Sequence, residues 1–258
     1  MRQGLVSFLL FGLLLVGMAC TPEPKTRVIA HRGYWQTEGS AQNSIRSLER
    51  ADEIGVYGAE FDVHYTADNV LVVYHDNDIQ GKNIQTSNYE ELKDLRLNNG
   101  ETLPTLESYL KRACDLEVRL VFELKSHATP ERNREAARAS VEMIKRMGLE
   151  KRTDYISFNL DACKEFIRLC PDASVAYLNG ELDPDALKEM GFTGLDYHYN
   201  VLREHPEWVE KCKALGLTTN VWTVNEPELI QEMADMGIDF ITTDIPEEAR
   251  EIVNTQTR

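Results

Sequence analysis

The sequence predicts one α/β domain folded as a (β/α)8 barrel of the TIM type. Short β-type runs alternate with helical periodicities from Arg27 to the end of the chain, a pattern typical of a parallel sheet with crossover helices. The 258-residue chain keeps about 240 residues after its N-terminal leader, and this length favours a closed barrel over a doubly wound sheet. No GxGxxG motif opens a helix after the first strand.

The expected elements follow this alternation in order. Strands are predicted over 28–31, 58–63, 70–75, 118–124, 155–158, 174–178, 194–197, 218–224 and 240–243, and helices over 45–54, 106–113, 134–147, 162–170, 184–190, 208–215 and 227–236. Nine strands are one more than such a barrel needs. Because the loop between Val63 and Val70 is too short for a parallel crossover, the second and third strands should form a hairpin-like unit. Residues 77–101 lack a long apolar period, so we expect a loop insertion there, over the barrel mouth.

The first 19 residues have the pattern of a secretory signal peptide. Arg2 supplies a positive charge, residues 5–16 are apolar, and Gly17 and Ala19 are small residues before Cys20. The arrangement resembles a bacterial lipobox, although a lipobox usually has Leu where Gly17 stands. We therefore expect residues 1–19 to be removed, Cys20 to be lipidated, residues 20–26 to act as a tether and residues 27–258 to form the barrel. The protein would be exported to the cell envelope and anchored to a membrane without spanning it; plain secretion and a retained anchor are the alternatives.

The remaining cysteines are expected to be buried free thiols, which pack as small hydrophobic groups. They are Cys114, Cys163, Cys170 and Cys212. An even number in an exported chain makes disulfides possible. However, Cys163 and Cys170 lie seven residues apart on one expected helix, a rise of about 10 Å that exceeds the reach of a disulfide.

Composition and charge narrow the class of function. With 42% hydrophobic and 28% charged residues the chain is an ordinary globular protein. Its net charge of −15 argues against nucleic-acid binding, and no protein partner is evident. An anionic substrate would have to be attracted by local cations, because the long-range field of the protein repels it.

Carboxylates stand at the ends of two expected strands. Glu60 and Asp62 are two residues apart on a strand and therefore point to the same face, and Glu123 ends another apolar run. Oxygen ligands with open positions suit one divalent cation, Mg²⁺ or Ca²⁺, rather than zinc. The alternative is a set of ion pairs with Arg32 or Lys125.

Two histidines also end β-type runs, His31 in the first and His75 in the third. Active-site residues of such barrels lie at the carboxyl ends of the strands, so both are expected at one rim. Histidine titrates near neutrality, and one can act as base while the other acts as acid, in either order. Two further histidines, His64 and His127, are weaker candidates for contact with a substrate.

These residues carry a resemblance to the glycerophosphodiester phosphodiesterase family, which extends from about Arg27 to Pro246. The matching motifs, in order, are His31-Arg32-Gly33, Glu60-Phe61-Asp62-Val63, Thr66-Ala67-Asp68-Asn69, His75-Asp76, Leu103-Pro104-Thr105-Leu106, Glu123-Leu124-Lys125, Ser157-Phe158, Trp222-Thr223-Val224-Asn225 and Thr243-Asp244-Ile245-Pro246. The resemblance implies a barrel related to phosphatidylinositol-specific phospholipase C. It also implies hydrolysis of glycerophosphodiesters to sn-glycerol 3-phosphate and an alcohol.

The resemblance also implies roles for single residues. Glu60, Asp62 and Glu123 would hold the cation, and His31 and His75 would be the acid/base pair.

On the substrate side, Arg32 and Lys125 would hold the phosphate, and Trp222 would form a pocket wall against the glycerol carbons. Phe158 and Asn43 are assigned to the same side, with Asn43 available to orient a histidine.

One motif departs from the family pattern. Family members usually carry Pro-Glu-Asn-Thr where this chain has Ala41-Gln42-Asn43-Ser44. Gln42 keeps the hydrogen-bonding length of Glu without its charge, which we interpret as a variation in substrate or metal. Two alternatives stay open: the same machinery acting on a lysophospholipid, sphingolipid or phosphoinositide, and a lipoprotein that binds glycerophospho-compounds or polyols without turnover.

Overall fold

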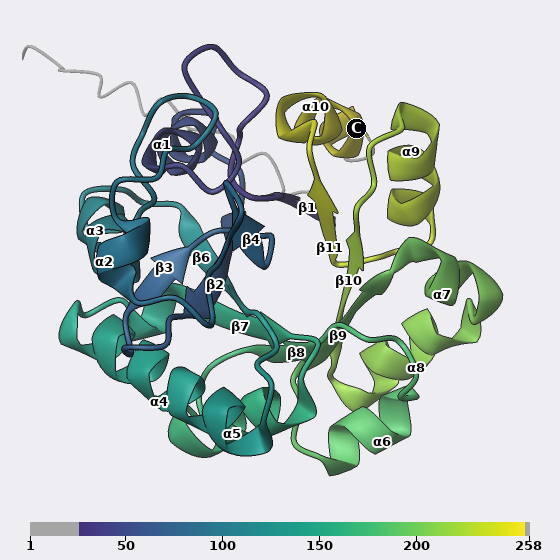
Figure 1. Ribbon diagram of the computed structural model, residues 1–258. Coiled ribbons are helices and arrows are strands. Elements are labelled where there is room, and N and C mark those ends of the chain that lie inside the picture. Colours follow the sequence, from purple (N-terminus) through teal and green to yellow (C-terminus); the bar gives the residue numbers. More distant parts are fainter. Residues whose placement is uncertain (1–25, 256–258) are drawn as a thin grey trace, which may run out of the picture.

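The computed structural model describes residues 26–255, which fold into a closed barrel of eight parallel strands (Figure 1). The barrel closes because the first strand pairs in parallel with both the second and the last, in the registers Ile29↔Gly58 and Arg27↔Phe240. The predicted fold class is confirmed. The barrel strands are β1 (Arg27–Ala30), β2 (Gly58–Tyr65), β6 (Arg119–Leu124), β7 (Thr153–Ser157), β8 (Val175–Tyr177), β9 (Gly194–His198), β10 (Thr218–Trp222) and β11 (Phe240–Thr243).

Helices surround the barrel (Figure 1). They are α1 (Ile45–Glu53), α3 (Leu106–Ala113), α4 (Pro130–Arg146), α5 (Leu160–Leu169), α6 (Pro184–Glu189), α7 (Tyr199–Glu204), α8 (Glu207–Leu215), α9 (Pro227–Asp235) and α10 (Pro246–Thr255), with a 3₁₀ turn η1 (Glu150–Arg152). Helices α7 and α10 were not predicted from the sequence. Several helices begin at a side-chain cap, in which Ser44, Thr105, Thr129, Asn159 or Asp183 accepts a hydrogen bond from the backbone N–H three residues on.

The one predicted strand that is not part of the eight-stranded barrel and the insertion form a unit beside it. β3 (Leu71–Val73) pairs antiparallel with β2, so the expected hairpin is confirmed. The insertion is not the plain loop that the missing periodicity indicated. It contains β4 (Asp78–Ile79), β5 (Lys82–Asn83) and α2 (Tyr89–Leu92) around a small core of its own made of Ala41, Val72, Ile79, Ile84, Leu92, Leu97 and Leu103. Seven buried apolar side chains hold this short segment in place.

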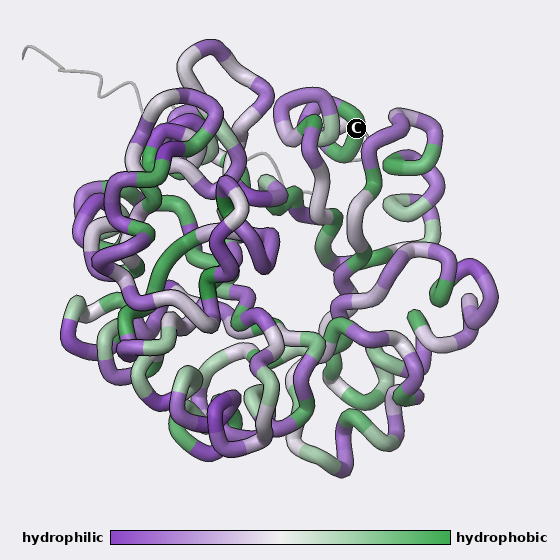
Figure 2. The backbone as a smooth tube through the Cα atoms, in the orientation of Figure 1, coloured by the Kyte–Doolittle hydropathy of each residue, from purple (hydrophilic) through white to green (hydrophobic). Residues whose placement is uncertain are grey.

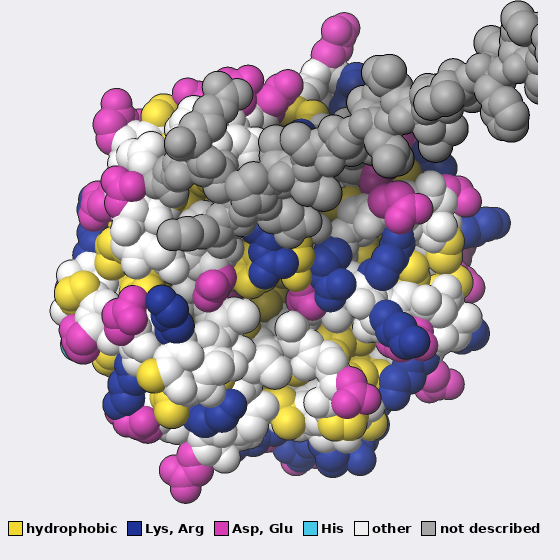
Figure 3. Space-filling model, turned by 180° about the vertical axis from the view of Figure 1, so that it is seen from behind, with side chains coloured by type: hydrophobic (Ala, Val, Ile, Leu, Met, Phe, Trp, Pro, Cys, Tyr) yellow, Lys and Arg dark blue, Asp and Glu magenta, His cyan; other side chains and the backbone are white. Residues whose placement is uncertain are grey.

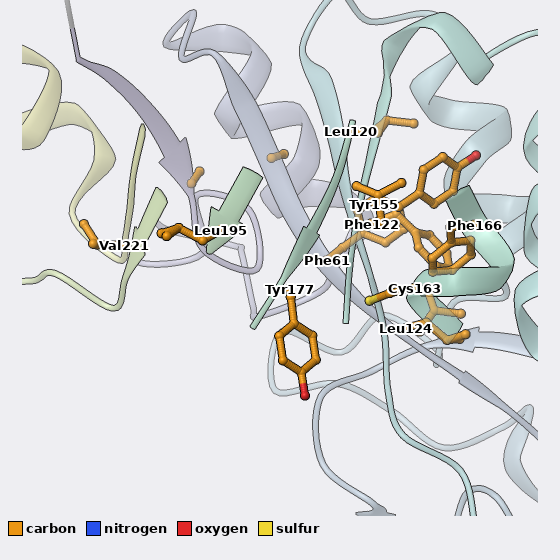
Figure 4. Close-up of a cluster of buried hydrophobic side chains, with 14 of the residues drawn as sticks. Phe61, Leu120, Phe122, Leu124, Tyr155, Cys163, Phe166, Tyr177, Leu195 and Val221 are labelled. Carbon is orange, nitrogen blue, oxygen red and sulfur yellow. The ribbon is translucent and has the colours of Figure 1, made fainter. Parts of the chain in front are cut away.

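An aromatic cluster joins the barrel wall to its outer helices (Figure 4). Phe122 of β6 lies edge-on to Phe61 of β2 at 5.6 Å and to Phe166 of α5 at 6.0 Å, and Tyr155 of β7 stacks on Phe166 at 4.6 Å. All four are fully buried. Edge-to-face and stacked pairs add to the area that these rings bury, so the strands that carry the acidic residues are rigidly supported.

Hydrophobic stretches lie mainly along the strands, and the outer loops are mostly hydrophilic (Figure 2). Basic and acidic side chains are interspersed on the face seen in Figure 3. No helix within residues 26–255 is both long and apolar enough to cross a bilayer. Cys20 and the predicted leader lie outside the described residues.

The four cysteines of the barrel are free, as expected. Cys163, Cys170 and Cys212 are buried, but Cys114 is exposed, so the prediction of burial was wrong for that residue. Cys114 is the cap residue at the end of α3, where the chain turns toward solvent.

Candidate active site

Three carboxylates meet inside the barrel. Glu60 and Asp62 share one face of β2, and Asp62 pairs in register with Glu123 of β6. One oxygen of each lies within 4.8 Å of the others. The three residues are only 3%, 1% and 8% exposed. The sequence predicted this convergence correctly.

The cluster fits a divalent cation. Oε2 of Glu60 accepts a hydrogen bond from the backbone N–H of Arg32 at 2.8 Å, but the buried Oε1 has no hydrogen-bond partner among the described residues. Burial and the neighbouring carboxylates raise the pKa of Glu60 well above its usual value, and burial with the charge of Asp62 raises the pKa of Glu123 to about 7. Buried carboxylates are normally paired or bound to a metal, and a set of oxygen donors suits Mg²⁺ or Ca²⁺.

Two cations border the cluster. Lys125 Nζ lies 3.1 Å from Asp62 Oδ1 and 2.8 Å from Glu123 Oε1, and Arg32 Nε lies 3.6 Å from Asp62 Oδ2. Burial raises the pKa of Asp62, but the positive charges of Lys125, His75 and Arg32 outweigh it and bring that pKa down to about 2. The ion pairs considered as an alternative are therefore present, and they leave Glu60 Oε1 unpaired.

His31 is oriented by a carboxylate from the far end of the chain. Its Nδ1 lies 2.8 Å from Oδ1 of Asp244, which follows β11. Asp244 also accepts hydrogen bonds from Trp35 Nε1 at 2.9 Å and Asn225 Nδ2 at 2.8 Å. Burial raises the pKa of Asp244, but the hydrogen bond and charge of His31 outweigh it, so the pKa is lowered. An ionised Asp244 accepts a hydrogen bond from Nδ1 of His31. In the neutral ring the free lone pair then lies on Nε2, which can accept a proton.

His75 has a similar but more open arrangement. Its Nδ1 lies 2.6 Å from Oδ1 of Asp76, and burial lowers its pKa. The buried His64 contacts the His75 backbone carbonyl through Nε2 at 3.2 Å, and its Nδ1 accepts from Gln85 of the insertion at 3.0 Å. Burial lowers the pKa of His64 to about 4, so this ring is neutral and supports the backbone of His75.

The prediction that Asn43 orients a histidine was wrong. Its Nδ2 donates to Asp62 Oδ2 at 2.8 Å, and its Oδ1 accepts from the backbone N–H of Asp62 at 3.0 Å. Asn43 therefore fixes a carboxylate of the cluster. The neighbouring Gln42 accepts a hydrogen bond from Arg32 Nη1 at 2.7 Å, so an uncharged amide is the partner of this guanidinium.

Two cavities meet at His75, and the smaller of them borders the cluster. The smaller, about 110 Å³, is lined by His31, Arg32, Glu60, His75, Glu123, Lys125, Ile156, Phe158, Leu178, Asp196, Trp222, Thr223 and Thr242. Phe158 and Trp222 meet edge to face at 5.5 Å and form its apolar wall. The larger, about 440 Å³, lies between the loop after β1 and the insertion and also contains His75. His127 lines neither cavity: it is buried and accepts a hydrogen bond from the Tyr65 backbone N–H.

Comparison with known proteins decides the family. Residues 31–248 match the glycerophosphoryl diester phosphodiesterase family. The chain belongs to this family. It is therefore an enzyme, a phosphoric diester hydrolase that acts on glycerophosphodiesters.

Individual relatives agree with the family match. A glycerophosphodiester phosphodiesterase of Caldanaerobacter subterraneus subsp. tengcongensis is 30% identical over 239 residues, covering 86% of this chain and 96% of that protein. A crystal structure of a glycerophosphodiester phosphodiesterase from Parabacteroides distasonis ATCC 8503 is 72% identical with a TM-score of 0.90, over 91% of this chain and 99% of that one. The Thermotoga maritima enzyme is 25% identical with a TM-score of 0.71, over 88% and 98%.

At this site the structure brings together most of the residues that were predicted from the sequence. The smaller cavity is lined by Glu60 and Glu123 together with His31, His75, Arg32, Lys125, Phe158 and Trp222. Asp62 does not line it but belongs to the same carboxylate cluster. Asp244 was quoted only as part of a motif, and its role as the partner of His31 was missed. Asp196, buried with Oδ1 unpaired among the described residues, lines the same cavity.

Proposed function

We propose that this hydrolase works by general acid/base catalysis with two histidines beside one Mg²⁺ or Ca²⁺ ion. The proposal rests on the placement of His31 and His75 beside a buried cluster of three carboxylates. The Nδ1 atom of each histidine is hydrogen-bonded to a further carboxylate, that of Asp244 or Asp76. Glu60, Asp62 and Glu123 would hold the cation. When bound, the cation would polarise a phosphoryl oxygen and neutralise charge that develops on it.

In this proposal His31 is the base and His75 the acid. His75 borders both cavities, whereas His31 borders only the smaller one. With the phosphate between Arg32 and Lys125, His31 Nε2 takes the proton of the attacking glycerol 2-hydroxyl. His75 donates a proton to the leaving alcohol oxygen as the P–O bond breaks, giving a cyclic phosphate.

Hydrolysis of the cyclic phosphate reverses the two roles. The now neutral His75 takes a proton from water, and the protonated His31 returns its proton to the glycerol 2-oxygen. The product is sn-glycerol 3-phosphate. Trp222 and Phe158 support this assignment, because their apolar faces suit the glycerol carbons.

The location of the enzyme is a separate proposal. The signal-like residues 1–19, Cys20 and the polar stretch after it favour a lipid-anchored protein of the cell envelope. Radiolabelled palmitate should label the wild-type protein in cells and should not label Cys20→Ala. Labelling of both proteins would contradict the proposal.

A product-resolved assay tests the reaction. The purified protein should release sn-glycerol 3-phosphate from glycerophosphodiesters with Mg²⁺ or Ca²⁺, and a chelator should abolish release. His31→Ala and His75→Ala should each reduce release by about 10²- to 10⁴-fold with unchanged circular dichroism. Binding without turnover, or cleavage of micellar lysophospholipids or sphingolipids alone, would contradict the proposal.

A further inference from the structure

The larger cavity is a separate compartment on the far side of His75. It lies between the loop after β1 and the insertion, and it meets the catalytic cavity at His75. Arg32 of the catalytic cavity donates to Gln42 of the larger one at 2.7 Å. A phosphodiester held at Arg32 therefore has one compartment for each of its two ester arms.

The two cavities differ in volume, and this difference indicates which ester arm each one holds. The larger cavity, about 440 Å³, is about four times the size of the smaller, about 110 Å³. It falls within the roughly 300–1,000 Å³ of small-molecule sites. In the proposed mechanism the glycerol arm lies beside Trp222 in the smaller cavity. The larger cavity then holds the other arm, the alcohol whose oxygen receives the proton of His75.

The lining of the larger cavity is mainly uncharged and hydrogen-bonding. Amides come from Gln36, Gln42, Gln80 and Asn98, with an indole from Trp35. The side chains of Gln36 and Asn98 make no hydrogen bond to other described residues, so both amides are available to a ligand.

The charged groups of this lining already have partners. Besides His75, they are Asp76 and Arg96. Asp76 lies 2.6 Å from His75 Nδ1, and Arg96 Nη1 donates to the backbone carbonyl of Gly100 at 2.7 Å. The carboxylate of Asp76 is thus bound by His75 through Oδ1, and Arg96 adds a positive charge to the same lining.

We infer that this compartment binds the leaving alcohol and selects an uncharged polyol, such as a cyclitol or sugar, over an amino alcohol. Amides offer both donors and acceptors, which match several hydroxyl groups at once. The face of Trp35 can pack on the C–H groups of a ring. An ammonium head group would lose water beside the positive charge of Arg96, and it would compete with His75 for the carboxylate of Asp76. The inference rests on the proposed function and narrows its substrate class.

Two substrates that differ only in the alcohol test the inference. Release of sn-glycerol 3-phosphate is measured from glycerophosphoinositol and from glycerophosphocholine, with Mg²⁺ and with Ca²⁺. We expect kcat/KM to favour the inositol ester by about tenfold or more. The double variant Gln36→Ala/Asn98→Ala should reduce this ratio by about fivefold or more. The control Lys82→Ala, exposed on β5 of the same insertion, should leave the ratio unchanged.

Equal rates, a preference for choline, or an unchanged ratio in the double variant would overturn the inference. Binding of both esters to His31→Ala is measured in parallel by calorimetry. If no ester is cleaved, the proposed function fails, while the ratio of the two Kd values still decides the inference: tighter binding of the inositol ester supports it, and equal or weaker binding overturns it.

Discussion

The two histidines of the proposed acid/base pair have carboxylate partners that differ in exposure and in hydrogen bonding. Asp244, the partner of His31, is 15% exposed and accepts two further hydrogen bonds, from Trp35 and Asn225. Asp76, the partner of His75, is 69% exposed and lies beside the large polar cavity. In the proposed mechanism His31 serves the glycerol arm, which is common to all substrates of the class, and its side of the site is rigid. His75 would serve the arm that varies, and its side of the site is open.

The carboxylate cluster is common to both sides of the site, so a substitution there should have the largest effect on activity. Glu60→Gln keeps the shape of the side chain but removes a charge from the cluster, so we expect kcat/KM to fall by about 10³-fold. The affinity for Mg²⁺ or Ca²⁺, measured by calorimetry, should fall as well. The matched control Glu38→Gln, on an exposed loop, should change neither quantity. Wild-type metal affinity in Glu60→Gln would refute the assignment of the cluster.

On the rigid side, Asp244→Asn should lower kcat by about 10²-fold with little change in KM. The amide of Asn can donate to His31 Nδ1 and so select the tautomer in which Nε2 carries the proton and cannot accept one. The fall in kcat should be accompanied by a changed pH profile, which a merely structural role of Asp244 would not produce. A normal kcat would show that His31 is not the base.

On the open side, Asp76→Asn should have a smaller effect, of about tenfold or less on kcat. Solvent screens an exposed carboxylate, and His75 is also supported through its backbone carbonyl by His64. Steady-state kinetics of Asp76→Asn and Asp244→Asn, run side by side, give the comparison. Equal losses in the two variants would remove the proposed difference between the two sides.

The smallest effect is expected for Glu165, a carboxylate bound by two arginines away from both histidines. It provides a baseline for the other variants. Hydrogen bonds from Arg168, and then from Arg138, lower the pKa of Glu165 from 4.5 to about 2 against the effect of burial. Because the folded pKa is lowered, the ionised group stabilises the fold above pH 4.5, and this contribution is lost as the pH falls toward 2. Glu165→Gln should therefore lower Tm at pH 7 by roughly 3 °C.

The difference in Tm between Glu165→Gln and wild type should shrink between pH 4.5 and 2. Calorimetric scans across this range check the trend, and kcat/KM at pH 7 should be unchanged. A difference that is constant with pH would contradict the lowered pKa.

The sequence was sufficient to predict the residues at the strand ends. In a parallel barrel all carboxyl ends meet at one rim, so motifs at 31, 60–62, 75 and 123–125 could be placed together without coordinates. The hairpin of β2 and β3 followed from the shortness of one loop. Both predictions needed only local pattern and the rule for parallel strands.

Contacts between distant segments were beyond reach of the sequence. His31 and Asp244 are 213 residues apart, and they meet because β11 closes the barrel beside β1. Asn43 bonds to Asp62, 19 residues away, from a backbone with a positive φ of 61°, and no pattern in the sequence indicated either feature. The insertion has order from a small core whose members come from three separate stretches of chain, and this core has no helical or strand period.

The central claim is that His31 is the base on the rigid side and His75 the acid on the open side. An sn-glycerol 3-phosphate ester of p-nitrophenol tests it, because p-nitrophenolate leaves without needing a proton. We predict that His75→Ala cleaves this ester within about tenfold of wild type while losing about 10³-fold on glycerophosphoinositol, and that His31→Ala is impaired on both. Rescue of His31→Ala instead, or no rescue of either variant, would contradict the account.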